Sequence, residues 1–119
     1  MWYEVRQQNN NEEKASTTQI CVPAGSKWFD GHFPQDPVLP GIAQVAVVHD
    51  LIRRALGKNL PIREIGRLRF KRKVGPTDRL SVTITPGDAS EKLYRFRMTC
   101  GKEPVCSGLL KVGSEKEKD

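Results

Sequence analysis

The stretch from position 41 to 56, GIAQVAVVHDLIRRAL, constrains the fold more than any other part of this chain. On a helix it is apolar on nearly every face until His49 and Asp50. A helix that is apolar all round is buried in its protein rather than lying on a surface. The stretch is too short to span a membrane. Gly57 follows as the expected C-cap, after two arginines that suit the negative end of the helix dipole.

The remaining segments predict β-strands, because apolar and polar residues alternate with a period of two. The apolar series are Leu68, Phe70 and Val74, then Leu80, Val82 and Ile84, then Tyr94, Phe96 and Met98. Residues 105–112 suit a last strand, and residues 2–7 and 16–22 suit a hairpin. One buried and one solvated face is what an antiparallel sheet over a single helix requires. The expected fold class is therefore α+β.

The length of 119 residues fits a single domain, expected over residues 1–113, followed by a charged tail over residues 114–119. We see no signal peptide, because the sequence becomes polar soon after Trp2. The three cysteines form an odd set without metal-ligand spacing, which favours reduced thiols and a cytoplasmic location. No cofactor and no metal site are expected.

A proline-braced segment leads into the predicted helix and contains one histidine. Pro34, Pro37 and Pro40 fix their own φ angles and push the residues before them toward extended conformations. Pro40 suits the first turn of a helix, and Gly41 lets a ligand approach its backbone N–H. Unpaired amides at a helix N-terminus carry partial positive charge and can stabilise an oxyanion. His32 can exchange a proton near neutral pH, so the pattern indicates an acid/base group beside an anion site.

Each of these residues also has an ordinary structural interpretation. A loop histidine is commonly held by hydrogen bonds without any catalytic role, and a glycine after a proline can simply relieve crowding. The combination of histidine, braced turn, Pro-Gly and apolar helix is much rarer than its parts. The catalytic interpretation therefore stands beside the structural one.

Seven residues carry a resemblance to a known family: Gly31, His32, Phe33, Pro34, Pro37, Pro40 and Gly41. They match GHFPxxPxxPGxxxxE, and the segment resembles the signature of the (3R)-hydroxyacyl-[acyl-carrier-protein] dehydratases of the FabA/FabZ type. The stretch LPGIAQ is also similar to the aryl-polyene-type thioester dehydratases. Residues 67–80, RLRFKRKVGPTDRL, resemble a strand–turn–strand segment of the same family, and the resemblance covers roughly residues 16–112.

The resemblance implies a hot-dog fold, in which a curved antiparallel sheet wraps around one long central helix, and a homodimer or higher hot-dog oligomer. It implies a hydro-lyase that removes water from a 3-hydroxyacyl thioester on the phosphopantetheine of acyl carrier protein, leaving a trans-2-enoyl thioester. By the same resemblance, His32 takes the proton from C2, and the N–H of Gly41 polarises the thioester carbonyl. The implied walls of the acyl pocket are Trp28, Phe29, Phe33, Leu39, Pro40, Ile42 and Val45.

The helix carboxylate of the family, which the other subunit supplies to help the hydroxyl leave, does not match, because this chain has Ala46 there. Asp50 and His49 lie one turn further along and are the nearest substitutes. The offset is about 5 Å, which is large for a proton transfer that needs hydrogen-bond contact or one bridging water. Asp50 is therefore either a displaced catalytic acid or a polar residue paired with Arg53 or Arg54.

The net charge of +6 and the isoelectric point of about 9.5 come largely from residues 63–79. The basic row in this region consists of Arg67, Arg69, Lys71 and Lys73. It is a solvated strand face, a nucleic-acid-binding stripe or a docking surface for an acidic partner. Interleaved aromatic residues are missing from that face, so nucleic acid is not the expected partner. No membrane partner is expected either. The resemblance implies an acidic carrier protein, whose approach such a field would accelerate.

Three functional hypotheses follow. The first is a dehydratase-like enzyme in which Asp50 or water replaces the missing acid. The second is a catalytically weakened acyl-binding subunit that pairs with a second hot-dog chain carrying the carboxylate. The third is a hot-dog thioesterase in which Asp50, the only carboxylate on the helix, activates water. The GHFPxxPxxPG motif favours the first hypothesis over the third, because thioesterases of this fold usually lack it.

Overall fold

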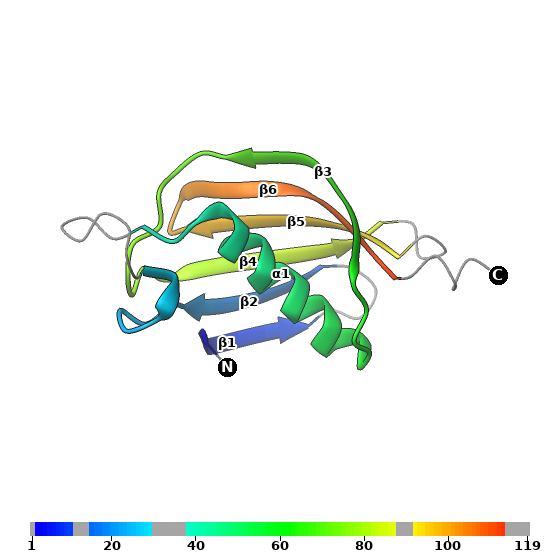
Figure 1. Cartoon of the computed structure of the whole chain (residues 1–119), viewed down its shortest axis with the longest axis horizontal. Coiled ribbons are helices and arrows are strands. Elements are labelled where there is room, and N and C mark those ends of the chain that lie inside the picture. The colour runs from blue at the N-terminus through cyan, green and yellow to red at the C-terminus, as the bar shows by residue number, and fades with distance from the viewer. Residues whose placement is uncertain (1, 11–14, 30–37, 88–91, 114–119) are drawn as a thin grey trace.

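One long helix lies across one face of a six-stranded antiparallel sheet (Figure 1). The computed structural model describes residues 2–10, 15–29, 38–87 and 92–113. The elements are β1 (Glu4–Asn10), β2 (Ser16–Cys21), the 3-10 helix η1 (Lys27–Phe29), α1 (Gly41–Leu56), β3 (Ile62–Phe70), β4 (Leu80–Pro86), β5 (Leu93–Cys100) and β6 (Glu103–Val112). The strand order is β1-β2-β4-β5-β6-β3, and every neighbouring pair is antiparallel. The predicted α+β class is confirmed.

The helix α1 has the bounds that the sequence predicted. Pro40 precedes it in an extended conformation, with φ −60° and ψ 152°. Gly57 ends it in the left-handed region at φ 66°, and its backbone N–H donates to the last-turn carbonyls. The residues buried against the sheet are Ala43, Gln44, Val45, Val47, Val48, Leu51 and Ile52. The expectation that the helix is buried all round is wrong for the single chain, since Ile42 is 72% exposed.

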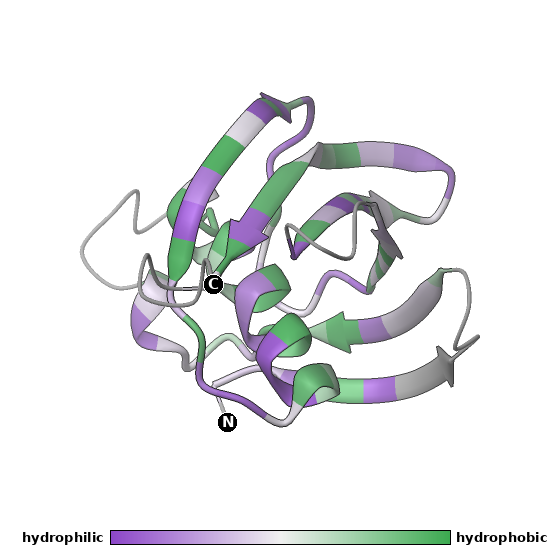
Figure 2. Ribbon diagram, turned by 90° about the vertical axis from the view of Figure 1, so that its right-hand side faces the viewer, coloured by the Kyte–Doolittle hydropathy of each residue, from purple (hydrophilic) through white to green (hydrophobic). Residues whose placement is uncertain are grey.

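The sheet curves around the helix, and hydrophobic and hydrophilic residues alternate along its strands (Figure 2). Leu80, Val82 and Ile84 of β4 point into the core, as do Phe96 and Met98 of β5. The alternation predicted for these two strands is therefore confirmed. Removing each such side chain from water contributes roughly 1.5–3 kcal/mol, so this inner face holds the helix on the sheet.

The strand β3 differs from its prediction. It begins at Ile62 and ends at Phe70, so Val74 is buried but lies outside the strand. The register with β6 shifts between Gly66 and Arg69, and Arg67 has a positive φ of 50°. The predicted alternation over residues 67–74 is thus wrong in part, because a β-bulge interrupts the period of two.

The predicted N-terminal hairpin is present as β1 and β2, which pair antiparallel. The three cysteines are free thiols, and Cys21 and Cys106 are buried. Burial raises the pKa of the Cys106 thiol to about 11. This thiol therefore stays protonated at neutral pH and packs as a small apolar side chain.

Candidate active site

Two hydrogen bonds fix the chain where it enters α1. The backbone N–H of Leu39 donates to the carbonyl of Val74 over 2.7 Å. The carbonyl of Leu39 accepts from Nε2 of Gln44 over 3.2 Å, and Leu39 itself is 1% exposed. Both backbone groups of Leu39 thus form hydrogen bonds, one to Val74 and one from Gln44. These bonds fix the position of the chain directly before Pro40, where the helix begins.

The first amides of the helix are available to a ligand. Pro40 provides no side-chain cap, and its carbonyl accepts from the amides of Ala43 and Gln44. No described residue accepts a hydrogen bond from the N–H of Gly41 or Ile42. Such N–H groups carry the partial positive charge of the helix dipole, so this end of α1 suits an anion or a polarised carbonyl.

The ring of Phe70 lies directly against Gly41. A Cβ atom on Gly41 would come within 2.6 Å of the tip of that ring. The ring is 49% exposed, although Phe70 is the last residue of β3. Glycine at this position therefore allows a close approach between the helix N-terminus and the free edge of the sheet, and it leaves an apolar wall beside the Gly41 amide.

His32 and Phe33 lie outside the described residues. The chain is anchored on both sides of them, because Phe29 is 7% exposed and Leu39 is 1% exposed within the same apolar core. The assignment of His32 as the base and of Phe33 as a pocket wall stays a prediction.

The other predicted pocket residues lie on two different sides of the helix start. Phe29, Leu39 and Val45 belong to the core between α1 and the sheet. Ile42 lies on the opposite, exposed face of α1. Trp28 is half-buried, and its ring centroid lies 5.7 Å from that of Trp2. Their role around an acyl chain stays a prediction.

Asp50 is held by three donors. The hydroxyl of Tyr3 donates to Oδ2, Nε of Arg54 lies 2.8 Å from Oδ2, and Nη2 of Arg53 lies 3.2 Å from Oδ1. Burial opposes ionisation, but hydrogen bonds from Arg54 and Tyr3 and the charges of both arginines lower the pKa of Asp50. Burial and the Asp50 carboxylate raise the pKa of Tyr3. The structure confirms that Asp50 pairs with Arg53 and Arg54, and this pairing favours a structural role.

His49 is also engaged, since its Nε2 lies 2.6 Å from the carbonyl oxygen of Leu60. Ala46 is partly exposed on the same side of the helix as Ile42 and Asp50. Its methyl group can neither donate nor accept a proton. Within the described part of α1, the N-terminal half thus offers polarised amides and apolar surface but no acid.

Sequence reasoning missed Tyr3 and Gln44. Tyr3 is 47 residues away from Asp50 and is 1% exposed, so no local pattern connects the two. Gln44 is 3% exposed, and its Oε1 has no hydrogen-bond partner among the described residues. A glutamine within an apolar helix is the only signal that pointed to it.

Among the described residues, no group of three or more histidine, cysteine, aspartate or glutamate side chains could hold a metal ion. No helix in the described part of the chain is long and apolar enough to cross a membrane.

One long helix against a curved six-stranded antiparallel sheet is the architecture of a hot-dog protein. A family model described as "ApeI-like: ApeI dehydratase" matches residues 7–109. The match covers most of the chain, which therefore belongs to this dehydratase family, as the sequence motif predicted.

Individual relatives agree with this assignment. The 3-hydroxyacyl-[acyl-carrier-protein] dehydratase FabZ of Pelotomaculum thermopropionicum is 36% identical over 101 residues, which cover 79% of this chain. The chain spans 65% of the length of that relative.

Solved structures share the fold. The structure described as "The Dehydratase Heterocomplex ApeI:P from Xenorhabdus doucetiae" matches with a TM-score of 0.84 and 24% identity, over 96% of this chain and 100% of that chain. A mutant of the thioesterase PA1618 from Pseudomonas aeruginosa matches with a TM-score of 0.65 and 16% identity, over 91% and 78% of the two chains. The hot-dog fold is therefore confirmed.

Proposed function

We propose that this protein removes water from a 3-hydroxyacyl thioester on acyl carrier protein and leaves a trans-2-enoyl thioester. The observation that carries the proposal is the amide of Gly41, which has no acceptor among the described residues and lies at the start of an apolar helix that follows the dehydratase motif. A carbonyl oxygen that accepts from this amide gains stabilisation as negative charge develops on it. A cytoplasmic setting agrees with the free thiols of the cysteines.

In the proposed reaction, His32 takes the proton from C2 of the substrate. The electron pair of the broken C–H bond forms the C2–C3 double bond, and the hydroxyl group leaves C3. An acid must protonate that hydroxyl group so that it departs as water. The N–H of Gly41 stabilises the enolate-like carbonyl meanwhile, and no cofactor is needed.

The proposed acyl chain lies beside α1, near its N-terminus. Phe70 forms an apolar wall next to the Gly41 amide, which supports an apolar slot at this end of the helix. We assign the remaining walls to the residues that the motif points to: Trp28, Phe29, Phe33, Leu39, Pro40, Ile42 and Val45.

The proposed assembly is a dimer formed through β3. This strand is an edge of the sheet, paired only with β6. It exposes Ile65 at 43%, Leu68 at 37% and Phe70 at 49%. The Phe70 ring lies against Gly41, the residue before the exposed Ile42. An edge strand with free backbone groups and apolar side chains is a template for pairing with another chain.

The missing acid favours a heteromer as the second candidate. In a homodimer both copies carry Ala46, so neither copy brings a carboxylate to that position. A second, different hot-dog chain with a carboxylate on its central helix would complete the site. The similar structure from Xenorhabdus doucetiae is described as a dehydratase heterocomplex, which supports this candidate.

A thioesterase reaction is less well supported. It would need a helix carboxylate to activate water, and Asp50 is the only carboxylate on α1. Its oxygens are occupied by Tyr3, Arg53 and Arg54. A carboxylate held by two guanidinium groups is a weak base, so it is poorly suited to deprotonating water.

The test is to measure enoyl formation and free thiol release from one 3-hydroxyacyl thioester. His32→Ala should lower enoyl formation by at least ~10²-fold, because a positioned base contributes this much. His49→Gln is the matched control, since it replaces the other of the two histidines and keeps a donor toward Leu60. Thiol release that exceeds enoyl formation, or a rate unchanged in His32→Ala, would reject the proposal.

A further inference from the structure

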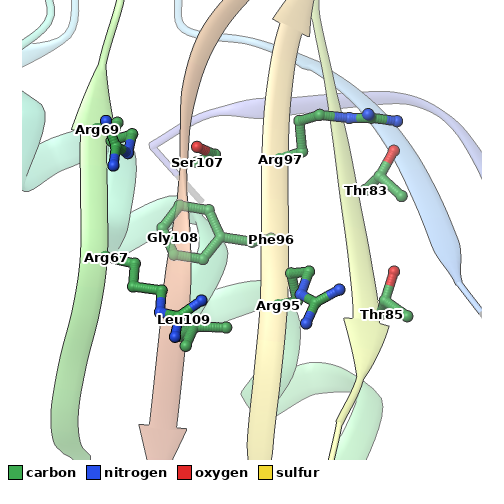
Figure 3. A pocket seen from close by; sticks show the side chains of 10 residues that line it. All are labelled: Arg67, Arg69, Thr83, Thr85, Arg95, Phe96, Arg97, Ser107, Gly108 and Leu109. Atoms are coloured by element: carbon green, nitrogen blue, oxygen red, sulfur yellow. The ribbon is translucent and has the colours of Figure 1, made fainter.

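The two faces of the sheet differ in polarity, and Gln44 is an exception on the inner side. The outer face carries arginine side chains from β3 and β5, among them Arg95 and Arg97 (Figure 3). The inner face packs against α1 through an apolar core. Among the described residues, Thr18 and Gln44 are the buried polar ones, each 3% exposed. Gln44 lies on α1, three residues after Gly41, so its contacts bear on the helix start.

The Leu39–Pro40 peptide unit depends on the side chain of Gln44. Proline has no backbone N–H, so this unit has one hydrogen-bonding group, the carbonyl of Leu39. Nε2 of Gln44 donates to that carbonyl over 3.2 Å. The two neighbouring units are held by the backbone instead. The N–H of Leu39 donates to the Val74 carbonyl, and the Pro40 carbonyl accepts from the amides of Ala43 and Gln44.

These contacts determine the direction of the Gly41 N–H. In a trans peptide unit the C=O and the N–H point in opposite directions. The Pro40 carbonyl points along the helix, so the Gly41 N–H points away from it, and no described residue accepts from this N–H. The ring of Pro40 fixes its φ angle, which leaves ψ, at 152°, to relate this unit to the one before it. Holding the Leu39 carbonyl therefore limits how far the Gly41 N–H can turn.

Hydrogen-bond pairing alone does not explain a buried glutamine at this position. Nε2 of Gln44 satisfies the Leu39 carbonyl, but Oε1 is itself buried and has no hydrogen-bond partner among the described residues. An unpaired buried acceptor costs free energy. The side chain thus satisfies one buried oxygen and introduces another, so it brings no net gain in pairing. What it adds is a fixed direction for the chain at the helix start.

We propose that Gln44 is a positioning residue, which acts through the Leu39–Pro40 peptide unit to hold the N–H of Gly41 toward the substrate carbonyl. The inference rests on the proposed function for the role of this amide. An amide stabilises developing negative charge best when its direction is fixed before the reaction, because no reorganisation is then needed. The ring of Phe70 lies directly against Gly41, which restricts where the carbonyl can lie.

The first test measures the Gly41 N–H itself, through its nitrogen-15 relaxation order parameter in the full-length protein without substrate. We expect about 0.85 in the wild type, as in a rigid backbone, and a fall toward about 0.6 in Gln44→Met. Leu51→Met is the matched control and should leave this value unchanged. Leu51 is 7% exposed on the same helix, and methionine conserves its volume.

Urea unfolding verifies that the variants are folded. The midpoint for Gln44→Met should stay near that of the wild type, because the unpaired Oε1 disappears as the Leu39 carbonyl loses its donor. Gln44→Leu is the second variant, in case methionine does not pack. Failure of both variants to fold would make Gln44 a purely structural residue and would overturn the inference.

The second test measures enoyl formation from a 3-hydroxyacyl thioester. Gln44→Met should lower kcat by about tenfold, because a displaced donor loses part of the ~10²–10³-fold effect of a whole one. KM should stay within about twofold, since the lost interaction acts on the transition state. A rise in KM with kcat unchanged would overturn the inference, as would an equal loss of kcat in Leu51→Met.

The order parameter separates this inference from the proposed function, because its measurement needs neither substrate nor catalysis. An unchanged Gly41 value in a folded Gln44→Met variant would overturn the inference even if the wild type forms the enoyl thioester. A wild type that forms no enoyl thioester would remove the proposed function. A lowered Gly41 value would then still show that Gln44 holds this amide.

Discussion

Asp50 illustrates how the neighbours of one side chain decide between a catalytic and a structural role. In the family motif the helix carboxylate falls at the position of Ala46. Asp50 lies one turn beyond that position and is the nearest carboxylate on the helix. Its contacts with Tyr3, Arg53 and Arg54 leave it ionised and tied to the N-terminal segment. A group that must stay charged to keep three partners is poorly placed to give a proton to a leaving hydroxyl.

Asp50→Asn should therefore lower the free energy of unfolding at pH 7, by about 1–2 kcal/mol, because charge-assisted hydrogen bonds are lost. The folded state lowers the pKa of Asp50 from its ordinary value of 3.8. Its stabilising contribution is thus present above that value and is lost as the pH falls through the folded-state pKa. Urea unfolding at several pH values measures it.

The difference between the wild type and Asp50→Asn should shrink as the pH falls below 3.8. Tyr3→Phe, which removes one donor and keeps the ring in the core, should show a smaller loss of stability with the same direction of pH dependence. A difference that is the same at pH 3 and pH 7 would contradict this account of Asp50.

At the scale of elements, the sequence pattern predicted α1, β4 and β5 well, because each has one periodicity that follows from one buried face. It failed for β3, where the pattern suggested a strand up to Val74. A bulge depends on a partner strand and not on the bulged segment alone. Gly108 on β6 and the bulge at Gly66–Arg69 on β3 are far apart in sequence, so the contact between them could not be predicted from a local pattern.

Gly108→Ala tests this strand contact. The new Cβ atom would come within 2.9 Å of the buried Phe96 ring and 3.1 Å of the Gly66 carbonyl oxygen. We expect a loss of about 1–3 kcal/mol in the free energy of unfolding, which is typical of overpacking. Gly66→Ala is the control, because its Cβ atom would meet only Leu109 at 3.9 Å and should change stability little. Equal losses for both variants, by urea titration, would contradict the steric account.

At the scale of the whole molecule, the two edges of the sheet differ. The edge strand β3 exposes Ile65, Leu68 and Phe70, whereas the only large hydrophobic residue described as exposed on the other edge strand, β1, is Val5. The apolar character of α1 predicted burial from the sequence, but the single chain buries only the side that faces the sheet. A second chain against β3 and Ile42 would account for the remaining apolar surface.

Ile65→Glu should accordingly shift the protein from dimer to monomer, because a charge on the paired edge must be desolvated. Val5→Glu is the matched control, since Val5 is 41% exposed on the opposite edge strand. Light scattering coupled to size-exclusion chromatography measures both masses. A dimer that survives Ile65→Glu but not Val5→Glu would place the interface at β1 and would contradict an interface at β3.

The candidate site was only partly predictable. The motif located Gly41 at the helix start and identified the gap at Ala46, because both depend on sequence spacing. It could not reveal the Phe70 ring over Gly41 or the Gln44 contact that holds Leu39, since these depend on how the strand and the helix pack. Long-range packing therefore decides which residues surround a site that a local motif identifies.

The central claim is that this chain holds the base and the carbonyl-polarising amide of a dehydratase but lacks the acid. The most direct measurement is the rate at which the purified protein forms a trans-2-enoyl thioester with Ala46→Glu, compared with the wild type and with Ala46→Gln. The account predicts that Ala46→Glu is faster by roughly 10²-fold, that Ala46→Gln is not, and that adding His32→Ala abolishes the gain. An unchanged rate in Ala46→Glu, or a gain that persists without His32, would contradict it.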